Sequence, residues 1–230
     1  MKLLRLFTRV ILCGITVMWA VACGPKPADR PKLSPFLEAA RQGDLETVRS
    51  MLKGSPGKLY ESDSNHNTAL GWAILESRKD VALFLLEAGH TVNPSDQCPF
   101  PPVMSCISNY TETSNELLEE LLKRGADPNV SYAKEGWRAL PMAVNNGQVE
   151  KIRLLAKYGA DPALTESRGE SALSIATGRL AEMRDPNYNL PHGELSDPAV
   201  RQREIDHWEK VLKTLQESFP ADRGGAAKGK

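Results

Sequence analysis

The sequence predicts an all-α fold, a solenoid of about five stacked pairs of short helices. Residues 136–163 read as two short antiparallel helices and a turn, because apolar residues recur at helical spacing on both sides of Gly147. Similar stretches recur with first-helix starts at residues 34, 68, 101, 138 and 171, which are 34, 33, 37 and 33 residues apart. One helix pair cannot bury its own apolar faces, so the copies are expected to stack and share a core.

The copies also share particular residues. These are Thr68, Leu70, Ala73, Ala139, Leu140, Ala143, Gly147 and the endings Gly89, Gly125-Ala126-Asp127 and Gly159-Ala160-Asp161. Together with the period of about 33 residues, they resemble the ankyrin repeat. The resemblance covers residues 34–219 and implies finger-like hairpins and inner helices that line a concave binding groove. It departs from the family at the His that usually follows the Leu, where this sequence has Gly71, Met104, Pro141 and Ser174.

Residues 1–22 read as a bacterial lipoprotein signal peptide. Three basic residues lie within residues 1–9, and residues 10–22 form an apolar stretch too short to span a bilayer comfortably. The junction Ala20-Val21-Ala22-Cys23 resembles a lipobox, which implies cleavage after Ala22 and lipidation of Cys23. Two alternatives stay open here: a cleaved signal that leaves Cys23 unmodified, and an uncleaved anchor.

Residues 23–33 are rich in Pro and polar residues and predict an extended tether between the lipid and the stack. Several acyl chains on one cysteine make a stable membrane anchor. Gly24 follows the cysteine, and by resemblance to the sorting rule of enterobacterial lipoproteins it favours the outer membrane over the inner one. The expected location is therefore a bacterial membrane, facing the periplasm.

The repeats are expected at about residues 34–63, 64–96, 97–134, 135–167 and 168–219. The first begins with Ser34 and Pro35, an N-cap followed by Pro in the first turn. The third carries about three extra residues near Asn109, between its two helices. In the second, at least two of the four side chains in the run Leu83-Phe84-Leu85-Leu86 are expected to be fully buried.

The fifth repeat departs from the pattern. Its first helix is expected to run from Ser171 to about Arg184, followed by an insert at residues 186–198. Asp197 and Pro198 then open a long helix to about Phe219, which is expected to cap the stack. Residues 220–230 are expected to be a flexible tail. The apolar stripe of the long helix consists of Ile205, Trp208, Leu212, Leu215 and Phe219.

Charge argues against two classes of partner. Residues 1–22 carry three basic residues, so the remainder has 29 − 3 = 26 basic against 29 acidic residues. Neither nucleic acid nor an anionic lipid surface is therefore the expected main partner. A hydrophobic content of 41% and a charged content of 25% are ordinary for a soluble globular chain.

The sequence contains no recognisable catalytic, metal-binding or phosphate-binding motif, so a protein without enzymatic activity, metal or cofactor is expected. Cys98 and Cys106 lack the spacing of a zinc site. They stay open as either a disulfide or two separate thiols with Cys106 buried. The alternative from another class is an enzyme that uses the 186–198 insert, with His192 and His207 near Asp197.

The expected chemistry is therefore surface recognition. The resemblance places binding residues just before each first helix and at the end of that helix. Phe100 and Trp137 stand at such places, and aromatic side chains contribute strongly to binding when they anchor a groove. The alternative is that each packs against its own finger. The candidate partner-binding residues are Trp137, Phe100, Lys134, Glu135, Asn145, Asn146, Asn67, Glu76 and Arg168.

These observations together predict a monomeric, membrane-anchored module that captures a protein partner in the groove. Two roles fit the prediction. One is a scaffold or protector for a periplasmic enzyme. The other is an immunity protein that neutralises an antibacterial toxin acting in the periplasm, for example a lipase.

Overall fold

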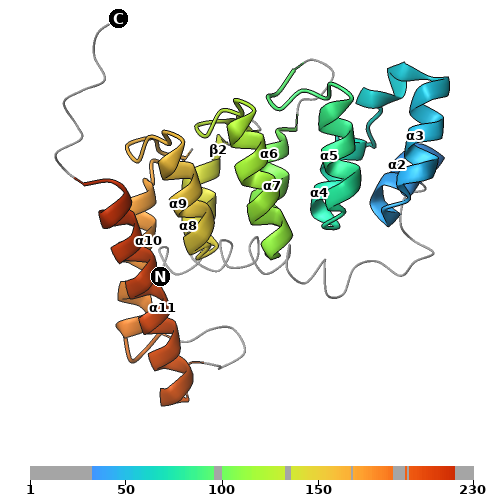
Figure 1. Cartoon of the computed structure of the whole chain (residues 1–230). Helices are drawn as coiled ribbons and strands as arrows, with labels where there is room; N and C mark the ends of the chain where they lie inside the picture. The colour runs from blue at the N-terminus through green and yellow to red at the C-terminus, as the bar shows by residue number, and fades with distance from the viewer. Residues whose placement is uncertain are drawn as a thin grey trace, which may run out of the picture. The chain divides into compact units, whose positions relative to one another are not determined.

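The computed structural model describes residues 33–95, 100–132, 136–166, 168–188, 195 and 197–220. The helices belong to one compact unit that begins at Pro35, and they form two layers in which each helix packs against its neighbours in the stack (Figure 1). The predicted all-α solenoid is confirmed. The inner layer consists of α2 (Pro35–Gln42), α4 (Ala69–Leu75), α6 (Pro102–Ser108), α8 (Ala139–Asn145) and α10 (Ala172–Arg184). The outer layer consists of α3 (Leu45–Gly54), α5 (Lys79–Glu87), α7 (Glu112–Lys123), α9 (Val149–Lys157) and α11 (Pro198–Ser218).

The core repeats along the inner layer. One apolar position is buried in the first four inner helices: Phe36, Leu70, Val103 and Leu140 are 0%, 0%, 1% and 3% exposed. Leu173 holds the same position in α10 and is 50% exposed. Each of the first four helices is packed against a following inner helix, whereas no described inner helix follows α10. Burial at this position therefore depends on the neighbouring repeat, as expected for a stack.

Four fingers connect the repeats, at residues 55–68, 88–101, 125–138 and 159–171. The first contains a short 3₁₀ helix, η1 (Pro56–Tyr60), and the third contains the two-stranded β1 (Ser131–Tyr132) and β2 (Trp137–Arg138). Two residues after the ends of α5, α7 and α9 lie Gly89, Gly125 and Gly159, whose φ angles of 94°, 86° and 90° are strained for other residues. A Gly at each of these places therefore lets the chain turn sharply into the finger.

Asparagine side chains link consecutive fingers. The Asn93 amide donates to Gly125 O at 3.0 Å, and its Oδ1 accepts from Asp127 N at 2.8 Å. Asn129 makes the same two contacts, to Gly159 O at 3.2 Å and from Asp161 N at 2.7 Å. These bonds join backbone groups of one turn to the side chain of the preceding turn, so neighbouring fingers are held in register.

The two helices of the last repeat lie where the capping residues in the sequence predicted them. α10 ends at Arg184 as predicted, and Asp197 caps α11 by accepting from Ala199 N at 2.8 Å. The members of the predicted stripe of α11 are buried to different extents: Trp208 and Leu215 are buried, and Ile205, Leu212 and Phe219 are half-buried. Val211 and Thr214, outside the stripe, are also buried. Because α11 packs against both α9 and α10, its buried face is wider than one stripe.

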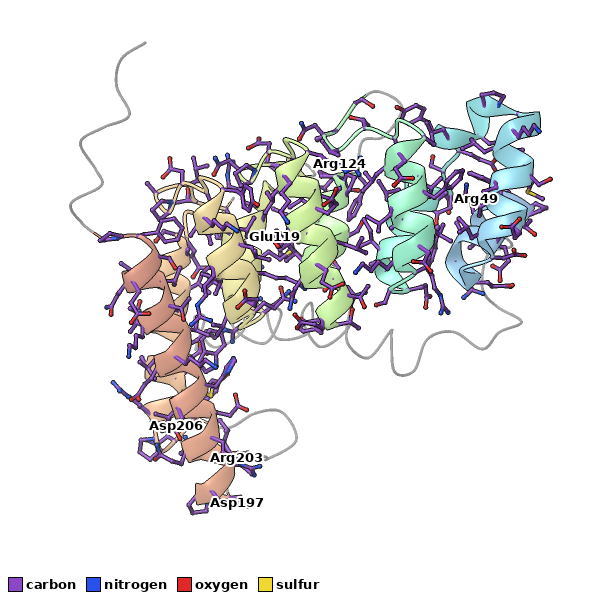
Figure 2. All side chains as sticks on the ribbon, viewed as in Figure 1. Arg49, Glu119, Arg124, Asp197, Arg203 and Asp206 are labelled. Carbon is purple, nitrogen blue, oxygen red and sulfur yellow. The ribbon has the colours of Figure 1, made fainter. Side chains whose placement is uncertain are left out.

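The outer helices are also linked by charged side chains. Lys79 on α5 lies 2.7 Å from Glu116 on α7, and Glu119 on α7 lies 2.8 Å from Lys157 on α9. Figure 2 labels Glu119 on this surface, along with Arg49 on α3, whose guanidinium lies 4.3 Å from the centre of the Phe84 ring. These side chains are largely exposed, so each ion pair contributes little to stability compared with the core.

The second repeat confirms the prediction for the leucine run, since Leu85 and Leu86 are 0% and 5% exposed. Cys106 is a free thiol, fully buried in α6, as one of the two predicted alternatives requires. Cys98 and the predicted signal peptide at residues 1–22 lie outside the described residues. Among the residues that are described, no helix is long and apolar enough to cross a membrane.

Candidate interaction surface

Three aromatic side chains from two fingers lie together, and we call them the aromatic finger cluster: Phe100, Tyr132 and Trp137. The Phe100 ring meets the Tyr132 ring edge to face, with centroids 4.5 Å apart. Tyr132 pairs with Trp137 across the antiparallel ladder, which places both side chains on the same face of the hairpin. All three are half-buried. Tyr132 thus connects Phe100 and Trp137, the two aromatics that the sequence singled out.

Tyr132 was missed by the sequence reasoning. The sequence feature that could have identified Tyr132 is its position shortly before Gly136. In the structure Gly136 has a φ of 64°, which suits a hairpin turn. A strand pair across that turn would have placed an aromatic residue opposite Trp137. The finger sequence is short and irregular, so the spacing of its residues alone did not identify Tyr132 as part of the surface.

Arg138 holds the base of this hairpin. Its Nε donates to Thr165 O at 3.1 Å in the next finger, and its Nη1 donates to Asn129 O at 3.1 Å. At the matching helix starts, Thr68 and Ser171 instead cap their own helices through side-chain oxygens. The Arg138 side chain thus does not cap its own helix but links the third and fourth fingers by hydrogen bonds. These bonds support the neighbouring Trp137.

Two of the predicted rim residues serve the stack itself. Asn145 Oδ1 accepts from Arg179 Nη2 at 2.9 Å, which connects α8 to α10. Asn146 Nδ2 donates to Ile107 O at 3.4 Å, near the end of α6. Both are half-buried. A role in binding stays a prediction for these two residues, and the structure adds a role in joining repeats.

The other described candidates lie at separate places on the fingers and inner helices. Asn67 is half-buried and bonds through its backbone N–H to Asp63 Oδ1 at 2.9 Å. Glu76 is exposed and lies 4.0 Å from Arg41. Arg168 is exposed in the fourth finger. Their part in binding stays a prediction. Lys134, Glu135 and the lipidation candidate Cys23 lie outside the described residues.

One lysine of the outer layer, on α9, is buried. Lys151 is 2% exposed, whereas the matching positions of α5 and α7 hold the apolar residues Val81 and Leu117. Its Nζ donates to Cys106 O at 2.7 Å and to Asn109 O, at the end of α6. Burial lowers the pKa of Lys151 to about 8 and raises that of the neighbouring Cys106 to about 12.

These contacts explain how the stack accommodates the extra residues of the third repeat. Asn109 is buried, and its side-chain amide donates to Ile74 O at 2.8 Å and Leu75 O at 3.0 Å in the preceding repeat. Lys151 and Gln148 of the following repeat donate to carbonyls at the end of α6. The cation also faces the negative end of the α6 dipole, which partly offsets its burial.

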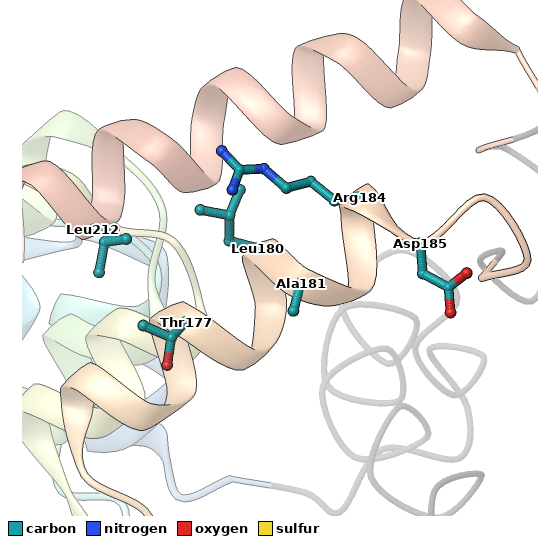
Figure 3. A pocket seen from close by; sticks show the side chains of 6 residues that line it. All are labelled: Thr177, Leu180, Ala181, Arg184, Asp185 and Leu212. Atoms are coloured by element: carbon teal, nitrogen blue, oxygen red, sulfur yellow. The ribbon is translucent and has the colours of Figure 1, made fainter.

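Open clefts occur in the described part of the chain, including the following two. One, of about 530 Å³, lies between α10 and α11; Figure 3 shows Leu180, Arg184 and Leu212 among its lining residues. The other, of about 660 Å³, lies beside η1. Neither is lined by a predicted binding residue. The described residues contain no group of His, Cys, Asp or Glu that could hold a metal ion.

The alternative enzymatic site is not assembled by its described members. Asp197 caps the start of α11, and His207 lies ten residues later on the same helix, roughly 15 Å along its axis at 1.5 Å per residue. His207 packs beside the Trp208 ring and against Gly147. The expectation that His207 could approach Asp197 is therefore wrong, because both residues belong to one continuous helix. His192 lies outside the described residues.

Comparison with known proteins gives a family. A model of ankyrin repeats in three copies matches residues 10–96 and 103–183. The chain is 37% identical over 147 residues to human BCL-6 corepressor-like protein 1, covering 62% of this chain and 8% of that protein. It is 29% identical over 142 residues to a putative ankyrin repeat-containing protein of Treponema pallidum, covering 61% of this chain and 46% of that protein.

A third relative matches over more of its length. Protein PhlB of Serratia liquefaciens is 25% identical over 189 residues, which cover 76% of this chain and 78% of that protein. In contrast, the chain spans less than half the length of the human and Treponema relatives.

Proposed function

This chain belongs to the ankyrin repeat family, and from that premise we propose that it is a membrane-anchored module that captures a protein partner on its fingers and inner helices. Ankyrin repeats generally mediate protein–protein interaction. The observation that supports capture of a partner here is the aromatic finger cluster, in which Phe100, Tyr132 and Trp137 remain partly exposed to solvent.

The cluster has the properties of a binding anchor. Large, rigid aromatic side chains lose little conformational entropy on binding, and they dominate the energetics of protein interfaces. The cluster joins the second and third fingers, and Arg138 braces the third against the fourth. A partner that lies across these fingers would therefore meet a surface that is already ordered, which lowers the entropic cost of association.

Site-specific photo-crosslinking tests the proposed surface. A photoreactive phenylalanine replaces Tyr132 in one protein and Arg153, which is exposed on the outer helix α9, in a control protein. We expect ultraviolet light to attach one partner protein at position 132 and none at position 153. Equal products from both positions, or products from 153 alone, would place the partner elsewhere.

The anchor is a separate proposal, supported by the junction Ala20-Val21-Ala22-Cys23. We propose that lipidated Cys23 holds the protein at a bacterial membrane, facing the periplasm. A Cys23→Ser protein should then leave the membrane fraction, whereas a Cys13→Ser control should remain there. Retention of uncleaved Cys23→Ser protein in the membrane would instead indicate a spanning segment.

A further inference from the structure

His90 occupies a place in its turn that holds a small residue in the next two turns. The backbone geometry is the same: His90 N bonds to Leu85 O at 3.0 Å, and Ala160 N bonds to Leu155 O at 2.9 Å. Ala126 and Ala160 are 4% and 6% exposed, and His90 is 4% exposed. An imidazole is thus enclosed where the fold elsewhere encloses a methyl group.

The hydrogen bonds of the ring suit only its neutral form. Nδ1 lies 2.9 Å from Thr91 O, so it carries the proton and donates to that carbonyl. Nε2 is buried, and no described atom bonds to it. In the neutral ring this nitrogen is only an unfilled acceptor. In the protonated ring it becomes a buried, unpaired N–H on a cation, which is strongly unfavourable.

Tyr60 connects this turn to the first finger. Its ring lies 5.0 Å from the His90 ring at a tilt of 42°, and its hydroxyl donates to Gly89 O at 3.2 Å. The same role is filled between later turns by Asn93 and Asn129. The joint between the first two repeats therefore depends on a contact in which His90 takes part.

Charged groups on the elements that meet here do not favour the protonated ring. Lys58 and Glu61 on η1 pair with each other at 3.0 Å, Glu87 closes α5, and Asp127 caps the next turn. Burial lowers the pKa of His90, the Thr91 carbonyl opposes that effect, and none of these charged groups contributes. Any pH dependence of this contact is therefore expected to come from protonation of His90 itself.

We propose that His90 is an acid-sensitive latch between the first and second repeats. Neutral His90 keeps the Tyr60 contact and the turn closed, and protonation opens the first finger away from the turn. The latch acts on the finger edge of the stack, so acidification would change the surface on which the proposed partner binds. The test measures the stability and the hydrogen exchange of this region directly, so it does not require the partner protein.

The sign of the effect follows from linkage. Because the pKa of His90 is lowered in the folded state, the unfolded chain binds more protons as the pH falls through about 6.5, so stability is lost on the acid side. Between pH 7.5 and pH 5, the melting temperature of the wild-type protein should fall by roughly 2–4 °C more than that of His90→Ala. His90→Gln, which keeps a neutral donor for Thr91 O, should behave like His90→Ala.

Hydrogen exchange locates the change. In the wild-type protein, exchange in residues 56–63 and 88–95 should accelerate at pH 5, beyond the intrinsic effect of pH, and it should not do so in His90→Gln. His66→Asn is the control, because His66 is exposed in the first finger, which the latch would release, and its φ of 63° suits Asn. Parallel melting curves for wild-type protein and both His90 variants, or acceleration confined to other segments, would overturn the proposal.

Discussion

Tyr132 lies directly opposite Trp137 in the ladder of the third finger, and its ring also contacts Phe100 of the second finger. The contact makes Trp137 part of a surface that spans two fingers. Trp137→Ala should therefore lower affinity for the partner by about thirtyfold or more, since removing an anchor typically costs ~2 kcal/mol or more. The melting temperature should change little, because the side chain is only half-buried.

The matched control for that variant is Tyr110→Ala. Tyr110 is the most exposed aromatic residue among those described, at 61%, and lies in the loop between α6 and α7, away from the finger hairpins. Binding measured by calorimetry should be unaffected in the control. A large loss of stability in Trp137→Ala, with unchanged affinity per folded molecule, would show that Trp137 belongs to the core and that the partner docks elsewhere.

Leu85 tests the packing of the most regular repeat. It is fully buried in α5, and truncation of a buried Leu to Ala costs about 2–5 kcal/mol of unfolding free energy. Leu85→Ala should therefore melt several degrees lower in calorimetry. Leu83, half-buried on the same helix, is the control, and Leu83→Ala should lose clearly less stability. Equal losses would show that the outer helix faces the core differently.

Lys151 should give the protein an unusual dependence on alkaline pH. Its pKa is about 8 in the folded state and 10.5 in an unstructured chain, so between these values the unfolded chain binds more protons. The unfolding free energy then rises with pH. Between pH 8 and pH 9 the gain should be about 1 kcal/mol, because a pKa unit corresponds to ~1.4 kcal/mol and the folded group is only part-way through its titration.

The window must not extend above pH 9. The Cys106 thiol, whose pKa burial raises from 9.0 to about 12, already ionises in the unfolded chain near pH 9 and opposes the effect more strongly above it. The measurement is urea unfolding at pH 7, 8 and 9, with Lys151→Leu as the comparison, since Leu117 holds the same place in α7. The wild-type protein should gain stability relative to this variant as the pH rises. An identical pH profile in the two proteins would contradict the buried, charged state of Lys151.

Arg201 clamps the segment that joins α10 to α11. Its guanidinium donates to four backbone carbonyls at 2.7–3.1 Å, those of Met183, Asp185, Tyr188 and Leu195. Arg201→Met removes all four bonds and should open residues 185–197 to proteases. Cleavage there should be about tenfold faster or more, since a tenfold change needs only ~1.4 kcal/mol of local stability.

Arg203 is the control for the clamp. It lies two residues away on α11, where Figure 2 labels it near Asp197, and its Nε donates to Ala199 O within its own helix. Arg203→Met should be cut at the wild-type rate when fragments are followed by mass spectrometry. Similar cleavage of both variants would show that contacts other than Arg201 hold the segment.

The sequence by itself determined the elements whose causes are local. Ser171 and the Asp197-Pro198 pair predicted the starts of α10 and α11, because a cap needs only a side-chain oxygen and the next turn of backbone. The recurrence of the same pattern about every 33 residues and the Gly-led turns predicted the stack for a similar reason, because the helix pair and turn of each copy are specified by residues within that copy.

Tertiary structure decided the rest. The Asn145–Arg179 bond, the cap that Lys151 makes on α6 and the contact of Tyr132 with Phe100 each join residues about 30–45 positions apart. The width of the buried face of α11 depended on its two packing partners rather than on its own periodicity. Such contacts follow from how one repeat is seated on the next, and that geometry is set by the summed packing of many side chains rather than by any local pattern.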